Sequence, residues 1–289
     1  MSHLAGPENN HPGKDKVTTT GLKTRKLAGE KITALTAFDC LGASILEEAG
    51  VDLILVGDSL ANTSLGYETT LPVSMEEMLS AVRAVKRGSS RAMLVADMPF
   101  GSYQTSIEDA LANAVAFLKA GAEAVKLEGG ASRAPLAARL AANGIPVMGH
   151  IGLTPQSVHA MGGYKIQGKA AEDARRLLDD ALALEEANVF SIVLEGIPAA
   201  LAARITGALE VPTIGIGAGS NCDGQILVFS DLLGLSVGKK PKFVRQYAQL
   251  RSIAIEAIES YCRDVREGDF PSASETYGNI PEKHTEKPA

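Results

Sequence analysis

The feature that most constrains this chain is a regular alternation of strand-like and helix-like patterns, which begins near residue 32. Short runs rich in Val, Ile and Leu are followed by stretches in which apolar residues recur every three or four positions. The expected strands are 32–38, 53–58, 93–98, 124–129, 146–151, 191–196, 213–218 and, with a weaker pattern, 232–237. Eight strands at about 25 residues per unit are typical of a (β/α)8 barrel, also called a TIM barrel.

The stretches between these runs predict helices that would surround the barrel. They are 41–49, 74–87, 106–120, 132–143, 170–187 and 199–208. We expect one catalytic domain over residues 21–270, because barrels of this size are commonly undivided. Residues 1–20 predict a mobile polar tail and 271–289 a second polar tail, while 242–268 predicts one or two closing helices.

An open, doubly wound sheet is the alternative architecture. It would place a glycine-rich phosphate loop after its first strand, but Thr36-Ala-Phe-Asp39 contains no glycine. Two strand-to-helix connections, 59–73 and 152–169, are unusually long. Long connections at the catalytic face of a barrel are commonly binding loops, so we expect them to border a site.

Local turn signals agree with the predicted helices. Gly50, Gly121 and Asn188 follow three of them, at the place where a left-handed residue is favoured. Ser74, followed three residues later by Glu77, fits a capping box at the start of a helix.

Composition and charge exclude several classes of function. The net charge of −6 argues against a nucleic-acid-binding surface, which is normally basic. No apolar stretch approaches the roughly 20 residues that a membrane span needs. Cys40, Cys222 and Cys262 have no paired or ligand-like spacing, which predicts reduced thiols in a cytoplasmic protein. We therefore expect small-molecule chemistry, with neither nucleic acid nor membrane as a partner.

Four of the expected strands end in a carboxylate, namely Asp58, Asp97, Glu128 and Glu195. Catalytic residues of barrels lie at the C-terminal ends of the strands. The first three acids end consecutive strands and are expected to converge, and adjacent carboxylates favour a divalent cation such as Mg²⁺. The structural alternatives are a helix cap for Asp58 and an ion pair between Glu128 and Lys126.

Lys126, His150 and Glu195 are expected to face the same barrel mouth. Lys126 lies two residues before Glu128, so both side chains project to one side of the strand. It could bind a substrate carboxylate, form a Schiff base or pair with Glu128. Glu195 stands apart from the other acids and is a candidate general base, with a helix cap or salt bridge as the alternative. His150 could hydrogen-bond a substrate oxygen or simply pack.

The strings around these residues are similar to those of the ketopantoate hydroxymethyltransferase family, in the same order, over roughly residues 20–270. They are Val-Gly-Asp58-Ser59, Ala-Asp97-Met-Pro99, Val-Lys126-Leu-Glu128-Gly-Gly130, Gly149-His150-Ile-Gly-Leu-Thr-Pro155-Gln-Ser157, Gly162-Gly-Tyr-Lys165, Glu195-Gly-Ile-Pro198, Ile214-Gly-Ile-Gly-Ala-Gly219 and Asp223-Gly-Gln225. Two segments depart from the family pattern. Phe38 and Cys40 replace a tyrosine and an aromatic residue, and Ser274-Glu-Thr-Tyr277 replaces the usual ending.

The resemblance implies a barrel of the phosphoenolpyruvate/pyruvate type, commonly assembled as a homodecamer. It implies transfer of a hydroxymethyl group from 5,10-methylenetetrahydrofolate to 3-methyl-2-oxobutanoate, through an enolate stabilised by Mg²⁺, to give 2-dehydropantoate in pantothenate biosynthesis. By matching motif, Mg²⁺ would be bound by Asp58, Asp97 and, directly or through water, Glu128. The residues that would contact the oxo acid are Asp58, Ser59, Asp97 and Lys126. The proton acceptor would be Glu195.

Two other functions remain open from the sequence. One is a lyase or aldolase of the same superfamily, which would share the enolate chemistry but need no folate. The other is an inactive barrel that serves as an oligomeric scaffold, which would have no need for four acids at one rim.

Overall fold

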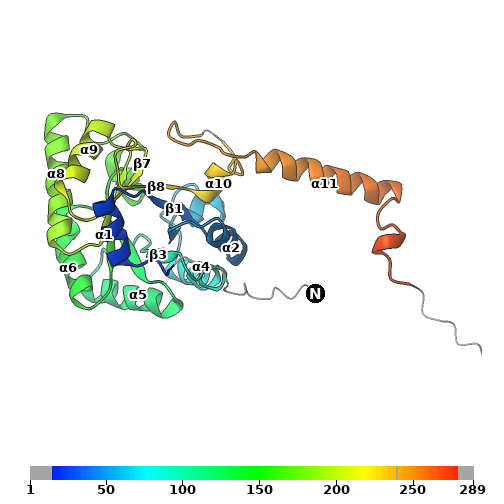
Figure 1. The fold of residues 1–289 in the computed structure, drawn as a ribbon, viewed down its shortest axis with the longest axis horizontal. Coiled ribbons are helices and arrows are strands. Elements are labelled where there is room, and N and C mark those ends of the chain that lie inside the picture. The colour runs from blue at the N-terminus through cyan, green and yellow to red at the C-terminus, as the bar shows by residue number, and fades with distance from the viewer. Residues whose placement is uncertain (1–14, 239, 279–289) are drawn as a thin grey trace, which may run out of the picture.

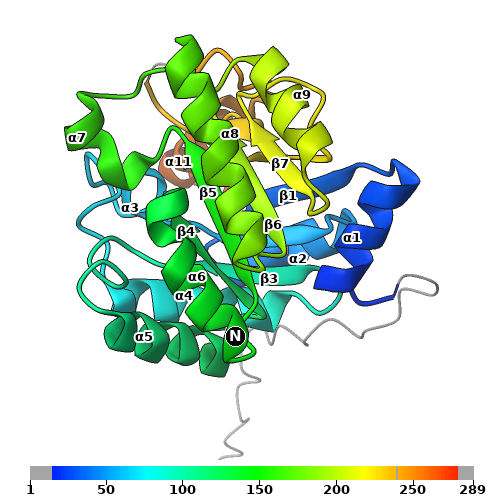
Figure 2. The same ribbon diagram turned by 90° about the vertical axis from the view of Figure 1, so that its left-hand side faces the viewer.

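Eight parallel strands close into a barrel in this computed structural model, which describes residues 15–238 and 240–278 (Figures 1 and 2). Each strand pairs with the next in sequence, and the last pairs with the first. The strands are β1 (Ile32–Thr36), β2 (Leu53–Val56), β3 (Met93–Asp97), β4 (Ala124–Glu128), β5 (Val147–Gly152), β6 (Ser191–Glu195), β7 (Thr213–Ile216) and β8 (Gly224–Leu227). The closed strand order excludes the open doubly wound sheet, so the predicted (β/α)8 barrel is confirmed.

Helices surround the barrel on its outer face (Figure 2). The longer ones are α2 (Cys40–Glu48), α4 (Met75–Gly88), α5 (Ile107–Ala120), α6 (Ala134–Ala142), α8 (Ala171–Glu186) and α9 (Ala199–Ala208), and the short ones are α3 (Leu60–Thr63), α7 (Val158–Met161), α10 (Phe229–Leu232) and the 3₁₀ helices η1 (Ala131–Arg133), η2 (Pro155–Ser157) and η3 (Ala273–Glu275). All six helices predicted between strands are confirmed, with small shifts at their ends. No helix in the described part of the chain combines the length and apolarity needed to cross a membrane.

The alternation of side chains along each strand produces two apolar cores. Residues two apart on a strand face the same side, and the inward-facing set, which includes Leu53, Met93, Ala124 and Met148, fills the barrel. The outward-facing residues pack against the helices. Towards the C-terminal ends of the strands the inward-facing positions become polar. This change collects charged side chains at one end of the barrel.

The predicted turn signals are also confirmed. The side-chain oxygen of Ser74 accepts a hydrogen bond from the backbone N–H of Glu77, and the Glu77 carboxylate accepts one from the N–H of Ser74 (2.8 Å). This reciprocal capping box begins α4. Gly50, Gly121 and Asn188 have φ values of 78°, 113° and 62°, so each adopts the left-handed conformation expected after a helix.

The eighth strand lies upstream of its predicted position. The prediction of 232–237 is wrong, because that segment contains the end of α10 and the turn after it, whereas β8 is Gly224–Leu227. Only residues 217–223 connect β7 to β8, so the regular spacing of strands along the chain breaks down here. Gly224 permits a close approach between neighbouring strands, since a Cβ atom there would lie 2.6 Å from the carbonyl oxygen of Ile32.

Helix α1 (Thr19–Ala28) packs against the N-terminal end of the barrel. Its Leu22 is fully buried in the inner core, and Val17 just before the helix is buried as well. Residues 17–20 of the predicted mobile tail, 1–20, are therefore part of the folded structure. Residues 1–14 and 279–289 of the two predicted tails lie outside the described residues.

Helix α11 (Leu250–Glu267) projects away from the barrel (Figure 1). None of its residues is buried. Ile258, Tyr261 and Val265 lie along one side of it and are 60%, 55% and 46% exposed. The prediction of closing helices over 242–268 is therefore wrong in one respect, because this helix does not cover its own barrel. Its apolar stripe is left uncovered by residues 15–238 and 240–278.

Gly88, at the end of α4, allows this helix to contact α2 closely. A Cβ atom at Gly88 would overlap the carbonyl oxygen of Cys40 and lie 2.9 Å from the Cβ of Ala43. We predict that Gly88→Ala lowers the free energy of unfolding by about 1–3 kcal/mol through overpacking. Gly207→Ala in α9 is the matched control, because nothing lies within 4 Å of a Cβ there. It should leave stability unchanged or raise it by about 0.4–1 kcal/mol. Equal denaturation midpoints for the two variants would contradict this packing.

Candidate active site

A cavity of about 1190 Å³ opens at the C-terminal end of the barrel. The two long connections, 59–73 and 152–169, contribute to its lining, as does the segment 240–243. The site residues predicted from sequence that line it are Asp58, Ser59, Asp97, Lys126, Glu128, His150 and Glu195. The structure thus brings together every predicted site residue. The strand register explains part of this convergence, because Asp97 is paired with Lys126 and Glu128 with His150.

Lys126 is a buried cation among the acids. Its Nζ lies 2.9 Å from Asp97 Oδ1 and 3.8 Å from Glu128 Oε1. Burial disfavours the charged amine, but the charges of Asp97, Glu128 and Asp58 outweigh burial and raise the pKa of Lys126 above its usual range. A Schiff base requires a neutral amine. This environment therefore favours Lys126 as a fixed positive charge, with Asp97 rather than Glu128 as its nearer partner.

One oxygen of each clustered carboxylate is held by a fixed donor. The side-chain amide of Gln156 donates to Asp58 Oδ2 (3.0 Å), and its backbone N–H donates to Glu128 Oε2 (3.0 Å). The backbone N–H of Asp58 donates to Asp97 Oδ2 (3.0 Å). The Asp58 carboxylate is therefore held by the network rather than by a helix end. The other oxygens of Asp97 and Glu128 are buried beside nitrogen atoms: Asp97 Oδ1 lies 2.9 Å from Lys126 Nζ, and Glu128 Oε1 lies 3.4 Å from His150 Nδ1.

The cluster has a surplus of acidic groups. Burial, together with repulsion from Asp97 and Glu128, raises the pKa of Asp58 well above its usual range. Burial also raises the pKa of Asp97, although the Lys126 charge opposes this effect. One lysine thus does not balance three carboxylates that share a space with little solvent.

These residues fit a divalent cation. Mg²⁺ typically takes one or two carboxylates and completes its shell with water or substrate oxygens. The acidic surplus matches that requirement, because the cluster holds more buried carboxylates than Lys126 alone can pair. Within residues 15–238 and 240–278, no group of three or more His, Cys, Asp and Glu side chains is arranged to hold an ion unaided.

His150 connects the acid cluster to Glu195. Its Nδ1 lies 3.4 Å from Glu128 Oε1, and its Nε2 lies 3.2 Å from Glu195 Oε2. Burial and the Lys126 charge oppose protonation of the imidazole, but its contacts with the two carboxylates outweigh them and raise the pKa of His150 to about 9. Glu195 therefore lies apart from the other three acids, as predicted, but the His150 imidazole contacts both Glu195 and Glu128.

Gln156 and Tyr103 have no role in the sequence predictions, although both belong to the buried network. The Tyr103 hydroxyl donates to Gln156 Oε1 (2.7 Å) and accepts from the backbone N–H of Glu128 (3.1 Å). The available signal for Gln156 was its place in the string Thr-Pro155-Gln-Ser157, which follows the end of β5. No comparable signal marks Tyr103. Phe38, which departs from the family pattern, is partly buried against the helical core.

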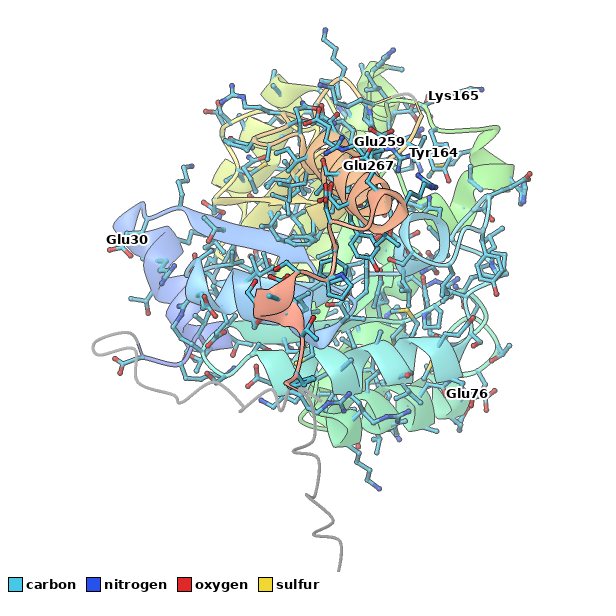
Figure 3. All side chains as sticks on the ribbon, turned by 90° about the vertical axis from the view of Figure 1, so that its right-hand side faces the viewer. Glu30, Glu76, Tyr164, Lys165, Glu259 and Glu267 are labelled. Carbon is cyan, nitrogen blue, oxygen red and sulfur yellow. The ribbon has the colours of Figure 1, made fainter. Side chains whose placement is uncertain are left out.

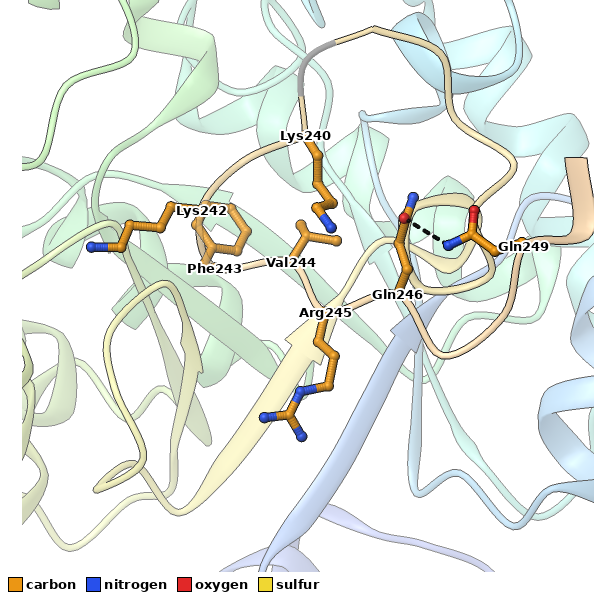
Figure 4. A pocket seen from close by; sticks show the side chains of 7 residues that line it. All are labelled: Lys240, Lys242, Phe243, Val244, Arg245, Gln246 and Gln249. Atoms are coloured by element: carbon orange, nitrogen blue, oxygen red, sulfur yellow. Dashed lines mark hydrogen bonds between the residues drawn. The ribbon is translucent and has the colours of Figure 1, made fainter. Parts of the chain in front are cut away.

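The rim of the cavity carries cationic and aromatic side chains. Tyr164 and Lys165 come from the connection 152–169 (Figure 3), and Lys240, Lys242 and Phe243 come from the segment that precedes α11 (Figure 4). Figure 4 shows that Lys240 and Lys242 extend in different directions. They therefore form a dispersed positive rim rather than a single pocket for an anion.

The fold and the acid-rich mouth together define a barrel enzyme of the (β/α)8 class. Similar solved structures include phosphonopyruvate hydrolase in complex with oxalate and Mg²⁺, with a TM-score of 0.58 and 16% identity over 89% of this chain and 92% of that one. Another is 2,3-dimethylmalate lyase, a member of the PEP mutase/isocitrate lyase superfamily, with a TM-score of 0.55 and 16% identity over 92% of this chain and 91% of that one. These likenesses concern the fold alone, and they agree with the closed (β/α)8 barrel.

The chain belongs to the ketopantoate hydroxymethyltransferase family, whose model matches residues 16–273. It is 57% identical over 269 residues to 3-methyl-2-oxobutanoate hydroxymethyltransferase of Carboxydothermus hydrogenoformans, covering 93% of this chain and 98% of the relative. The protein of the same name from Syntrophus aciditrophicus is 53% identical over 263 residues, covering 91% and 97%. The resemblance inferred from the motifs is confirmed, and the protein is a transferase enzyme.

Replacement of Lys126 tests whether a buried cation holds the acids together. We predict that Lys126→Met lowers the free energy of unfolding by about 3–5 kcal/mol, because it leaves buried carboxylates without their partner. Lys119→Met is the matched control, since Lys119 is an exposed lysine at the end of α5. It should change stability by no more than about 0.5 kcal/mol. The free energies of unfolding of both variants are compared by chemical denaturation in the presence of a metal chelator. A Lys126→Met variant as stable as Lys119→Met would contradict this role.

Proposed function

We propose that this enzyme transfers a hydroxymethyl group from 5,10-methylenetetrahydrofolate to 3-methyl-2-oxobutanoate, giving 2-dehydropantoate for pantothenate biosynthesis. The observation that carries the proposal is the division of the cavity into two parts. Asp58, Asp97 and Glu128 surround Lys126 on one side, and Glu195 stands on the other side of His150. Family membership and relatives above 50% identity support the same reaction.

The chain's own residues can carry the proton step. Lys126 and Ser59 bind the oxo acid, with Lys126 acting as a fixed charge toward its carboxylate. Glu195, whose side chain is 16% exposed, has access to the cavity and accepts the proton from C3. His150 contacts Glu195 and orients its carboxylate. In the predicted alternative role, His150 hydrogen-bonds a substrate oxygen directly.

Mg²⁺ is proposed as the cofactor, held by Asp58 and Asp97. When bound, it supplies Lewis-acid stabilisation to the negative charge that develops on the oxo acid as C3 loses its proton. The donor set supports this choice, because hard cations prefer carboxylate oxygens. The phosphonopyruvate hydrolase structure, which shares the fold, contains Mg²⁺ with oxalate.

A folate co-substrate is supported by the size of the cavity. Its volume of about 1190 Å³ exceeds the roughly 300–1,000 Å³ of most small-molecule sites. The rim offers Tyr164 and Phe243 for an aromatic group and Lys165 and Lys242 for an acidic tail. A lyase of the same fold needs no such donor. Product formation that proceeds equally well without the folate would therefore favour the lyase.

Glu195→Gln tests the proposed base. We predict that this variant still binds 3-methyl-2-oxobutanoate in the presence of Mg²⁺ but exchanges the C3 proton with solvent about 10²–10⁴ times more slowly. Proton NMR in deuterated water measures the exchange without the folate. Glu186→Gln, at the exposed end of α8, is the control and should exchange at the wild-type rate. Unimpaired exchange in Glu195→Gln would remove this residue from the mechanism.

We further propose that the protein acts in the cytoplasm and self-associates as a homodecamer. The reduced state of the three cysteines is consistent with that compartment. The uncovered stripe on α11, formed by Ile258, Tyr261 and Val265, supports self-association, because apolar side chains exposed in a row favour burial against a partner. Figure 3 shows acidic residues, among them Glu259 and Glu267, along the same helix.

Charge placed on the apolar stripe should disrupt the assembly. We predict that the double variant Ile258→Glu with Val265→Glu has a lower native mass than the wild type by light scattering. The double variant Ser252→Glu with Ser260→Glu changes the net charge equally but lies off the stripe, so it should keep the wild-type mass. Identical masses for all three proteins would show that the stripe does not mediate assembly.

A further inference from the structure

Gln156 is a buried neutral residue that contacts two of the clustered acids at once. It lies in η2, immediately after β5, and is 5% exposed. Its side-chain amide nitrogen donates to Asp58 Oδ2 (3.0 Å) and to the carbonyl oxygen of Met98 (3.0 Å), and its backbone N–H donates to Glu128 Oε2 (3.0 Å). It thereby links acids from the ends of two strands.

The orientation of the Gln156 amide is fixed from its other end. Gln156 Oε1 accepts hydrogen bonds from the Tyr103 hydroxyl (2.7 Å) and from Gln104 Nε2 (3.3 Å). A flipped amide would point its oxygen at the Asp58 carboxylate and the Met98 carbonyl, which are both acceptors. The flipped arrangement would therefore lose the donated hydrogen bonds and place like partial charges in contact.

Tyr103 also connects the amide to the second acid. Its hydroxyl accepts a hydrogen bond from the backbone N–H of Glu128 (3.1 Å) while it donates to Gln156. Glu128 is thus held through its backbone by Tyr103 and through its carboxylate by Gln156. Neither contact uses Glu128 Oε1, which lies 3.4 Å from His150 Nδ1 instead.

The consequence is that neutral donors hold one carboxylate oxygen of Asp58, Oδ2, and one of Glu128, Oε2. Neutral donors add no charge that would compete with a cation, unlike a lysine or arginine in the same place. Hydrogen bonds from outside a metal's own ligands commonly set the orientation of those ligands, and their loss typically costs 10–100-fold in metal affinity.

We propose that Gln156, locked by Tyr103, is a positioning residue that orients Asp58 and Glu128 for a divalent cation. This inference rests on the proposed function only in requiring that a divalent cation binds at the cluster. Gln156 need not touch the substrate, and its effect passes through the two carboxylates.

Mn²⁺ binding to the protein without substrate tests the proposal, because Mn²⁺ prefers the same oxygen ligands and its free form is measured by electron paramagnetic resonance. Gln156→Met keeps the side-chain volume but removes the amide hydrogen bonds, including the one to Asp58, while the backbone N–H bond to Glu128 remains. It should weaken Mn²⁺ binding about 10–100-fold. Tyr103→Phe removes the shorter of the two hydrogen bonds to the amide oxygen and the acceptor of the Glu128 N–H, and it should weaken binding by a smaller factor.

Gln104→Met is the matched control. It removes the longer hydrogen bond to Gln156 Oε1 (3.3 Å), leaves that of Tyr103 (2.7 Å) and contacts neither Asp58 nor Glu128, so Mn²⁺ affinity should stay within about twofold of the wild type. In activity assays, the Mg²⁺ concentration for half-maximal rate should rise for Gln156→Met, and excess Mg²⁺ should restore part of kcat. A purely structural role would not produce this rescue.

Five outcomes are informative. Weakened Mn²⁺ binding by folded Gln156→Met, as judged by circular dichroism, supports the proposal. If Gln156→Met does not fold, weakened binding by Tyr103→Phe supports it instead. If folded Gln156→Met binds Mn²⁺ with wild-type affinity, the positioning role is overturned and the proposed reaction is left intact. If Gln156→Met does not fold, wild-type affinity in Tyr103→Phe has the same consequence. Absence of Mn²⁺ binding by the wild type overturns both the positioning role and the proposed metal.

Discussion

The balance of buried charge at the barrel mouth is the constraint on which the site depends. Three carboxylates converge on Lys126 in a region with little solvent, where unpaired charges are costly. Lys126 neutralises part of this negative charge. Hydrogen bonds from two backbone N–H groups and from the Gln156 amide stabilise a further part of it. Burial and the remaining negative charge together raise the pKa of Asp58 in the protein alone. In the proposed function, a divalent cation would neutralise this charge.

The barrel supplies this arrangement through simple geometry. On β3, β5 and β6 the inward-facing residues are apolar up to the last inward position, where the side chain becomes polar. Val193 and Glu195 on β6 show the change, as do Met148 and His150 on β5. Because neighbouring strands are in register, their polar C-terminal ends lie side by side. No loop is needed to bring these residues together. The loops then add the parts that the strands lack, of which Gln156 is the clearest case.

The fold and the charged residues of the site could be predicted because they follow local patterns. Strand and helix periodicity identified seven of the eight strands, and the acids stood at the strand ends. The eighth strand was misplaced because β8 follows β7 after a short connection, and the apolar run near 232–237 imitates a strand. Tyr103 and the outward course of α11 depend on contacts between distant segments. Periodicity carries no information about such contacts.

Calorimetric titration of 3-methyl-2-oxobutanoate into the wild-type protein tests the central claim most directly. In the proposed site, a bound metal completes the binding site for the oxo acid beside Lys126. We therefore expect a clear heat of binding with Mg²⁺ present and its loss after a chelator removes the metal. Binding of equal strength under both conditions would contradict the account, because the acids at the barrel mouth would then serve no cation.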